Sequence, residues 1–127
     1  MVAVLPADHP LAEGAELHLR ALRDEAFILT PRHVGPSSYD TVVTACRAAG
    51  FEPRLGQVAP QMLSVVSLVS VGLGVSVVPG VMRSLRLAGS RFLNIEGGPV
   101  SELSVAHRRD NRSKVLAHFL AHLTPMP

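Results

Sequence analysis

The sequence predicts an α/β fold with a largely parallel sheet. Short apolar runs, typical of buried strands, alternate with stretches whose apolar residues recur at helical spacing. Proline and glycine separate the two kinds of segment. The 127 residues, 47% of them hydrophobic and 17% charged, match one ordinary globular domain rather than a disordered chain or a coiled coil. Strands that alternate with helices indicate parallel neighbours joined by helical crossovers.

Six apolar runs are the expected strands, at residues 2–5, 26–30, 53–58, 75–78, 92–95 and 103–106. Residues 6–16, which mix proline, glycine and acidic residues without periodicity, are expected to be a loop. Residues 31–36 form a second expected loop, and Gly97, Gly98 and Pro99 form a turn before the last strand.

Helical segments are expected at residues 17–22, 37–49, 60–72, 81–85 and 112–123. The second shows the strongest signals: Ser37 as N-cap, Asp40 to complete a capping box, and Gly50 as a left-handed stop. The apolar stripe of that helix comprises Tyr39, Val42, Val43, Cys46 and Ala49. The stripe of the last helix comprises Val115, Leu116, Phe119, Leu120 and Leu123.

Residues 55–82 carry no charge and could in principle span a bilayer. Pro60, Gly72, Gly74 and Pro79 instead divide them into a piece of helix length and a piece of strand length, so a buried helix and a buried strand are expected. The N-terminus has no basic region of a secretory signal. A single cysteine fits a reducing compartment. The expected location is the cytoplasm, with no membrane partner.

The sequence offers no catalytic set, so we expect a protein that is not an enzyme and uses no cofactor and no metal. No serine lies in a G-x-S-x-G setting. Cys46 lies on an apolar stripe, where an inert buried thiol is expected. His118 and His122 have the spacing of a zinc-protease helix, but Phe119 replaces its glutamate, which favours a solvated helix face. Gly72 and Gly74 end a helix rather than open one, which is the wrong order for phosphate binding.

A binding role remains. Ligands of open α/β sheets bind beyond the carboxyl ends of the strands, at helix N-termini. The helix after residue 36 would present the backbone N–H groups of Ser37, Ser38 and Tyr39 together with two hydroxyls, which suits a carboxylate better than a cation. The alternative is that these serines only cap the helix, because capping and anion binding use the same groups.

Four segments of the chain resemble the effector-binding domain of LysR-type transcriptional regulators. They are Val2-Ala-Val-Leu-Pro-Ala-Asp-His-Pro-Leu11, Leu19-Arg-Ala-Leu-Arg-Asp-Glu-Ala-Phe-Ile28, the stretch from Pro60 to Pro79 with its Val-Gly-Leu-Gly-Val, and His107-Arg-Arg-Asp110. The loop sequence Pro-Arg-X-X-Gly-Pro-Ser is most similar to family members that sense acids from aromatic catabolism.

The resemblance implies a periplasmic-binding-protein-like (type II) fold with two Rossmann-like subdomains and the effector in the cleft between them. Residues 1–96 would form the second subdomain, and residues 97–127 would supply a strand and helix that return to a first subdomain missing from this chain. The effector-binding residues would be Thr30, Pro31, Gly35, Pro36, Ser37 and Ser38. A periplasmic-type solute-binding protein and, less favoured, an α/β enzyme are the alternatives.

The resemblance also bears on partners. The expected ligand is a small carboxylate, while DNA would be bound only through a helix-turn-helix domain that this sequence does not contain. Net charge supports this reading, because residues 1–82 carry −2 and residues 83–127 carry +4, a mild asymmetry for a nucleic-acid surface. The chain is expected to self-associate, since an edge strand and the apolar stripe of the last helix would lack their sheet partners.

Overall fold

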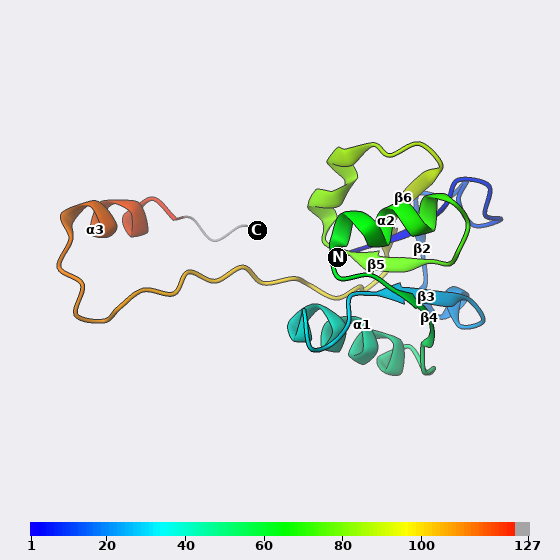
Figure 1. Ribbon diagram of the computed structural model, residues 1–127, viewed down its shortest axis with the longest axis horizontal. Helices are drawn as coiled ribbons and strands as arrows, with labels where there is room; N and C mark the ends of the chain where they lie inside the picture. The colour runs from blue at the N-terminus through cyan, green and yellow to red at the C-terminus, as the bar shows by residue number, and fades with distance from the viewer. Residues whose placement is uncertain (124–127) are drawn as a thin grey trace.

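The computed structural model describes residues 1–123 and shows strands and helices in alternation (Figure 1). The strands are β1 (Val2–Pro6), β2 (Glu16–Leu17), β3 (Ala26–Leu29), β4 (Arg54–Val58), β5 (Ser76–Val78) and β6 (Ser90–Ile95). The α-helices are α1 (Pro36–Ala48), α2 (Met62–Ser70) and α3 (Lys114–Ala121), and the 3-10 helices are η1 (Leu19–Leu22) and η2 (Gly80–Leu85). The short strand β2 falls at the end of the expected loop at residues 6–16.

The sheet is largely parallel, as predicted. Four strands lie in the order β2-β6-β1-β5, and β3 pairs in parallel with β4. A bridge between Phe27 and Val75 joins β3 to β5: Ile28 N–H donates to the Val75 carbonyl (2.8 Å), and Val75 N–H donates to the Ala26 carbonyl (2.9 Å). Strand β1 is antiparallel to both of its neighbours, β5 and β6, while the other five strands run in one direction.

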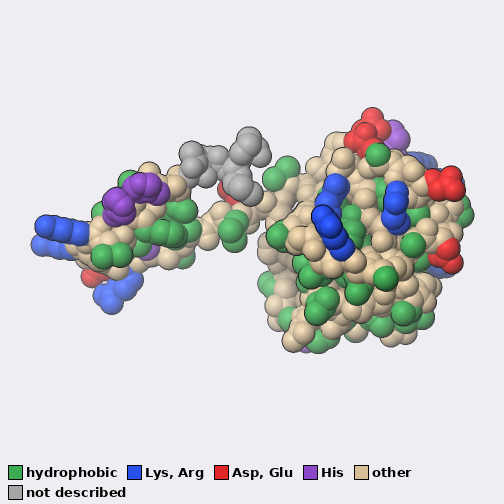
Figure 2. Space-filling view, turned by 90° about the horizontal axis from the view of Figure 1, so that it is seen from above, with side chains coloured by type: hydrophobic (Ala, Val, Ile, Leu, Met, Phe, Trp, Pro, Cys, Tyr) green, Lys and Arg blue, Asp and Glu red, His purple; other side chains and the backbone are tan. Residues whose placement is uncertain are grey.

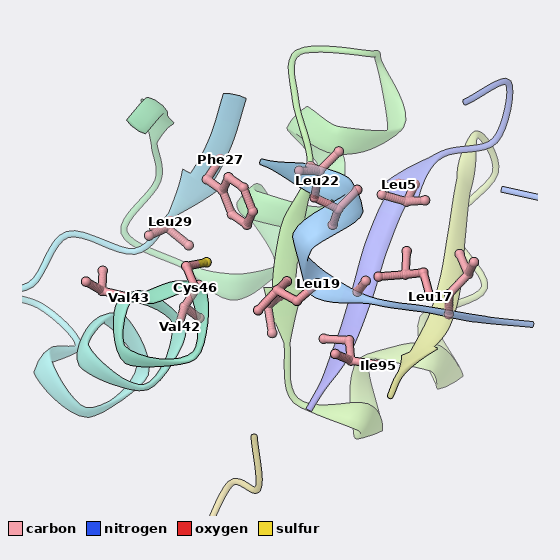
Figure 3. Packing of buried hydrophobic residues seen from close by; sticks show 14 residues of the cluster. Leu5, Leu17, Leu19, Leu22, Phe27, Leu29, Val42, Val43, Cys46 and Ile95 are labelled. Carbon is pink, nitrogen blue, oxygen red and sulfur yellow. The ribbon is translucent and has the colours of Figure 1, made fainter. Parts of the chain in front are cut away.

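Side chains that alternate along the strands build a core on each face of the sheet. Phe27 and Leu29 of β3 point toward α1, where they pack with Val42 and Cys46 (Figure 3). Ile28, between them, faces the opposite side and packs in the cluster formed with α2. The second cluster comprises Val2, Val4, Ile28, Ala59, Val65, Val66, Val69 and Val78. The two clusters make three layers, with α1 and α2 on opposite faces of the sheet.

The uncharged stretch forms a buried helix and a buried strand, as expected. Helix α2 buries Val65, Val66 and Val69, and every residue of β5 is buried. Ser76, the polar residue of β5, donates its hydroxyl proton to the Ile28 carbonyl over 2.6 Å. Among the described residues, no helix has the length and hydropathy needed to cross a membrane.

The predicted strand at residues 103–106 is wrong. Residues 100–113 are exposed and form no strand, and Leu103 is 98% exposed. A strand needs a neighbour to bond its backbone groups, and within residues 1–123 this segment has none. The segment carries α3 away from the sheet (Figure 1). Helix α3 begins after Ser113, whose hydroxyl accepts a hydrogen bond from Leu116 N–H (3.4 Å).

Helix α3, at Lys114–Ala121, is shorter than the expected 112–123. Side chains of its apolar stripe are exposed to solvent. Val115 is 80%, Phe119 52% and Leu123 44% exposed. An exposed sheet edge is also present, but it is β4 rather than the expected last strand. Strand β4 pairs on one side only, and its Leu55 and Val58 are exposed. Residues 124–127 of the expected return segment lie outside the described part of the chain.

Candidate functional site

The predicted effector loop joins the carboxyl end of β3 to the start of α1. The Pro31 carbonyl accepts hydrogen bonds from Val34 N–H (2.9 Å) and Gly35 N–H (3.0 Å), which closes the loop into a tight turn. The turn brings Thr30 against Gly35, so closely that a Cβ on Gly35 would lie 3.3 Å from the Thr30 methyl group. Thr30, Pro31, Gly35 and Ser38 are half-buried at this edge, and the remaining two predicted residues, Pro36 and Ser37, are exposed.

The start of α1 differs from the prediction. Gly35, not Ser37, is the N-cap, and Pro36 takes the first helical position, where its fixed φ and missing N–H are tolerated. No side chain caps the helix. Tyr39 N–H donates to the Gly35 carbonyl (3.0 Å), so it belongs to the helix ladder and is not free for a ligand. The N–H groups of Ser37 and Ser38 are those that the first turn leaves without a partner inside the helix.

A second helix N-terminus lies at the same edge of the sheet. The ends of β3 and β4 meet where Ala59 N–H donates to the Leu29 carbonyl (3.2 Å). Helix α2 follows with Gln61 as its N-cap, again without a side-chain cap, and begins at Met62 rather than at Pro60 as predicted. Both uncapped N-termini follow adjacent parallel strands, which is the position where open α/β sheets bind ligands. Partial positive charge from two helix dipoles is therefore present at this edge.

Asp40 binds the loop instead of capping the helix. The Arg32 guanidinium donates from Nε to Oδ1 (2.8 Å) and from its terminal nitrogen to Oδ2 (2.9 Å) of Asp40. These hydrogen bonds lower the pKa of Asp40 and raise that of Arg32. The predicted capping box fails because the N-cap is Gly35, two residues before the predicted Ser37, so Asp40 is no longer three residues after the N-cap. The pair ties the tip of the loop to the first turns of α1.

A groove of about 1120 Å³ on the flank of α1 was not predicted from the sequence. Its walls come from η1, α1 and the turn after β6, and of the predicted site residues it includes Ser37 alone. The lining comprises His18, Leu19, Arg20, Ala21, Arg23, Ser37, Asp40, Thr41, Thr44, Ala45, Ala48, Ala49, Ile95, Glu96, Gly97, Gly98 and Pro99. The small side chains of α1 that leave this space, such as Ala45 and Ala48, are visible in the sequence and could have indicated a groove. The sequence does not show that η1 lies opposite them.

The sequence also drew attention to a cysteine, a histidine pair and a glycine outside the loop, and the structure shows the surroundings of each. Cys46 is fully buried, and burial raises the pKa of its thiol to about 11, in agreement with the expected inert thiol. His118 and His122 are exposed on α3. Among residues 1–123, no three histidine, cysteine or acidic side chains gather in a group that could enclose a metal ion. Gly74 lies so close to the Ala26 carbonyl that a Cβ would come within 2.4 Å of its oxygen, so this glycine has a packing role.

Comparison with known proteins identifies relatives along the whole chain. The family model of the LysR substrate binding domain matches residues 1–126. The HTH-type transcriptional regulator IlvR of Caulobacter vibrioides is 38% identical over 122 residues, which are 94% of this chain and 41% of IlvR. AlsR of Bacillus subtilis is 30% identical over 94% of this chain and 40% of its own length. These relatives are transcriptional regulators and not enzymes, and the chain spans about two fifths of their length.

Solved structures give the same answer for the fold. The effector binding domain of QuiR in complex with shikimate matches with a TM-score of 0.64 and 25% identity, over 75% of this chain and 44% of that one. The BenM effector binding domain with its effector benzoate matches with a TM-score of 0.64 and 26% identity, over 74% and 43%. HinK of Pseudomonas aeruginosa covers 95% of this chain and 43% of its own, with a TM-score of 0.69 and 22% identity.

Proposed function

Because this chain belongs to the LysR substrate-binding domain family, we propose that it senses a small organic acid, whose carboxylate binds at the start of α1. The groups that receive the carboxylate are the N–H groups of Ser37 and Ser38, with the Thr30 hydroxyl beside them. Gly35 allows the ligand to approach the loop, and Pro31 and Pro36 hold the loop in shape. The proposed ligand class is supported by the shikimate and benzoate bound to two structural relatives.

The observation that carries this proposal is the absence of a side-chain cap on α1. Sequence reasoning left two roles open for the serines, capping or anion binding. If a serine hydroxyl capped the helix, it would occupy the N–H groups that a carboxylate needs. Neither serine hydroxyl caps α1. The neighbouring helix α2, whose N-cap is Gln61, also has no side-chain cap. Two helix N-termini that keep their N–H groups free offer donors and partial positive charge to an anion.

The proposal extends to the whole regulator in three respects. We infer that residues 1–96 form the second subdomain of an effector domain and that residues 97–127 return to the first. The other wall of the effector cleft then comes from the part of the relatives that this chain does not span. In such a cytoplasmic regulator, effector binding changes the balance between subdomain arrangements and thereby moves the DNA-binding domains of the full-length protein.

The test is a titration of the 15N-labelled chain with benzoate and with shikimate, followed by backbone NMR. Amide signals of Ser37 and Ser38 are expected to shift in a saturable way, because their protons would donate to the carboxylate. Benzylamine, which has the same ring but a positive charge, serves as the control ligand and is expected to leave these two signals in place.

A matched pair of variants distinguishes the loop from the groove. Thr30→Val removes the hydroxyl next to the proposed site and keeps the shape of the side chain, and Thr44→Val makes the same change on the wall of the groove. Affinity for the acid is expected to fall in the first variant and to stay within about twofold in the second. Shifts confined to Thr44, Ala48 and Gly97, or no shift with either acid, would contradict the proposed carboxylate site.

A further inference from the structure

Two histidines form an exposed pair near the end of α3. His118 and His122 are four residues apart, so both project from the same side of the helix. Their ring centroids lie 4.3 Å apart, and the ring planes are inclined by 49°. Figure 2 shows histidine side chains on the outer surface of the lobe that carries this helix. Both residues are exposed to solvent.

The orientation of one ring is fixed by the helix itself. Nδ1 of His122 lies 2.7 Å from the carbonyl oxygen of His118. A carbonyl oxygen only accepts hydrogen bonds, so Nδ1 carries the proton and donates it. Nε2 of His122 is then the nitrogen with a free lone pair. Metal-binding histidines commonly have this arrangement, in which one ring nitrogen donates to a backbone carbonyl and the other binds the ion.

The spacing of the rings suits a shared ion. A zinc–nitrogen bond is about 2.0–2.1 Å long, which places each ring centroid roughly 3.2 Å from the metal. Two imidazoles that bind one ion at an angle of roughly 90–110° then have centroids about 4.5–5.2 Å apart. The observed 4.3 Å is close to this range, and a small side-chain rotation covers the difference.

The electrostatic setting also favours a cation. His122 is the C-cap of α3, where the last carbonyl groups of the helix concentrate partial negative charge. Lys114, four residues before His118 on the same side of the helix, carries a positive charge that opposes cation binding, but it stands at the opposite end of the helix from His122. Within residues 1–123, no other helix or strand packs closely against this face to exclude an ion.

We propose that His118 and His122 form a surface site for a divalent cation of the zinc type, which prefers imidazole nitrogen. With no third protein ligand gathered among the described residues, water molecules fill the remaining positions. From the sequence, Phe119 in place of the glutamate of a zinc-protease helix favoured a solvated helix face, and no metal was expected. The structure points to a binding site without hydrolysis, and this site is independent of the proposed effector loop.

The test is a titration of the 127-residue chain with ZnCl2 at pH 7.5, measured by calorimetry and by NMR of the histidine ring signals. One saturable site is expected, with shifts at the rings of His118 and His122. His118→Gln and His122→Gln are each expected to weaken zinc binding at least about tenfold. His107→Gln and His33→Gln, which change exposed histidines outside α3, serve as controls and are expected to change it less than about twofold.

Two further measurements test whether imidazole nitrogen binds the zinc ion. Zinc binding is expected to weaken as the solution is made more acidic, because protons compete with the metal for imidazole nitrogen. MgCl2, a hard cation that prefers oxygen ligands, is expected to produce no shift. The proposal is overturned if the double variant His118→Gln/His122→Gln still binds one zinc ion with wild-type affinity. It is equally overturned if the wild-type chain shows no saturable binding.

Discussion

Gly74 lies directly against the carbonyl oxygen of Ala26, and a Cβ at position 74 would come within 2.4 Å of that oxygen. The same carbonyl accepts the hydrogen bond from Val75 N–H that joins β5 to β3. The contact therefore lies at the junction between the four-stranded and the two-stranded parts of the sheet. A residue with a side chain cannot occupy position 74 without moving one part away from the other.

Gly74→Ala is expected to lower the free energy of unfolding by about 2–3 kcal/mol, because the new methyl group displaces the Ala26 carbonyl and strains the backbone. Urea denaturation followed by circular dichroism measures the change. Gly72→Ala is the matched control: its φ of +85° disfavours a side chain, but nothing lies within 4 Å of the added Cβ. A cost of about 1 kcal/mol is expected there. Equal costs for the two variants would contradict the role given to the contact.

The Cys46 thiol is expected to make stability fall at alkaline pH. Its pKa is about 11 in the folded chain, because burial disfavours the thiolate, whereas an unfolded cysteine ionises near its ordinary value. As pH rises from the ordinary value toward 11, the unfolded state loses the thiol proton first, so the equilibrium moves toward unfolding. Denaturation midpoints measured up to pH 10.5 check this. Cys46→Ala is expected to flatten the decline, and an unchanged slope in that variant would contradict it.

Asp40 is expected to titrate at lower pH than an ordinary carboxyl, because Arg32 donates two hydrogen bonds to it. Since the folded-state pKa is depressed, the stability that the pair contributes is present above the ordinary carboxyl pKa and is lost as pH falls. Carbon NMR of the side chain follows the titration. Arg32→Gln is expected to raise the pKa of Asp40 more than Arg47→Gln does, since Arg47 acts only through its charge. The reverse order would be inconsistent with the structure.

The chain is expected to self-associate through the apolar stripe of α3. Val115 and Phe119 are mostly exposed, and within residues 1–123 no other helix or strand packs closely against α3, so a second copy can bury them. Sedimentation velocity over a roughly hundredfold concentration range is expected to show a rising sedimentation coefficient, which Phe119→Glu abolishes. Ala117→Glu adds the same charge beside the stripe and is expected to have little effect. Association that persists in Phe119→Glu would place the contact elsewhere, for example on the open edge of β4.

Apart from β2, which lies where a loop and the start of a helical segment were expected, the strands and helices of residues 1–96 could be predicted from the sequence because their signals are local. Proline, glycine and the apolar period bound each element, and the alternation of Phe27, Ile28 and Leu29 between two clusters is the pattern expected of a strand buried on both faces. The segment at residues 103–106 shows where such reasoning fails. Its apolar residues suit a strand, but a strand exists only when another strand pairs with it, which periodicity does not reveal.

The candidate site shows the same division. The family resemblance and the helix N-terminus located the loop at residues 30–38, but the N-cap was misplaced by two residues. Ser37 and Gly35 are both acceptable N-caps by residue type. The choice between them depends on the loop, in which Gly35 N–H donates to the Pro31 carbonyl and the Arg32 guanidinium donates to the Asp40 carboxylate. The groove beside α1 could not be predicted at all, because it forms between segments as distant as His18 and Pro99.

The antiparallel strand β1 has a consequence for how the polypeptide acquires its structure. Val2 pairs with Val78 on one side and with Asn94 on the other, so β1 acquires both of its neighbours only after β5 and β6 have been synthesised. Strands β3 and β4 pair with each other across a shorter stretch of sequence and can form earlier, before β3 bonds to β5. Until β6 is synthesised, the apolar residues of β1 remain uncovered. During synthesis, the apolar residues of β1 are therefore exposed for longer than those of β3 and β4, and we expect them to need protection by a chaperone.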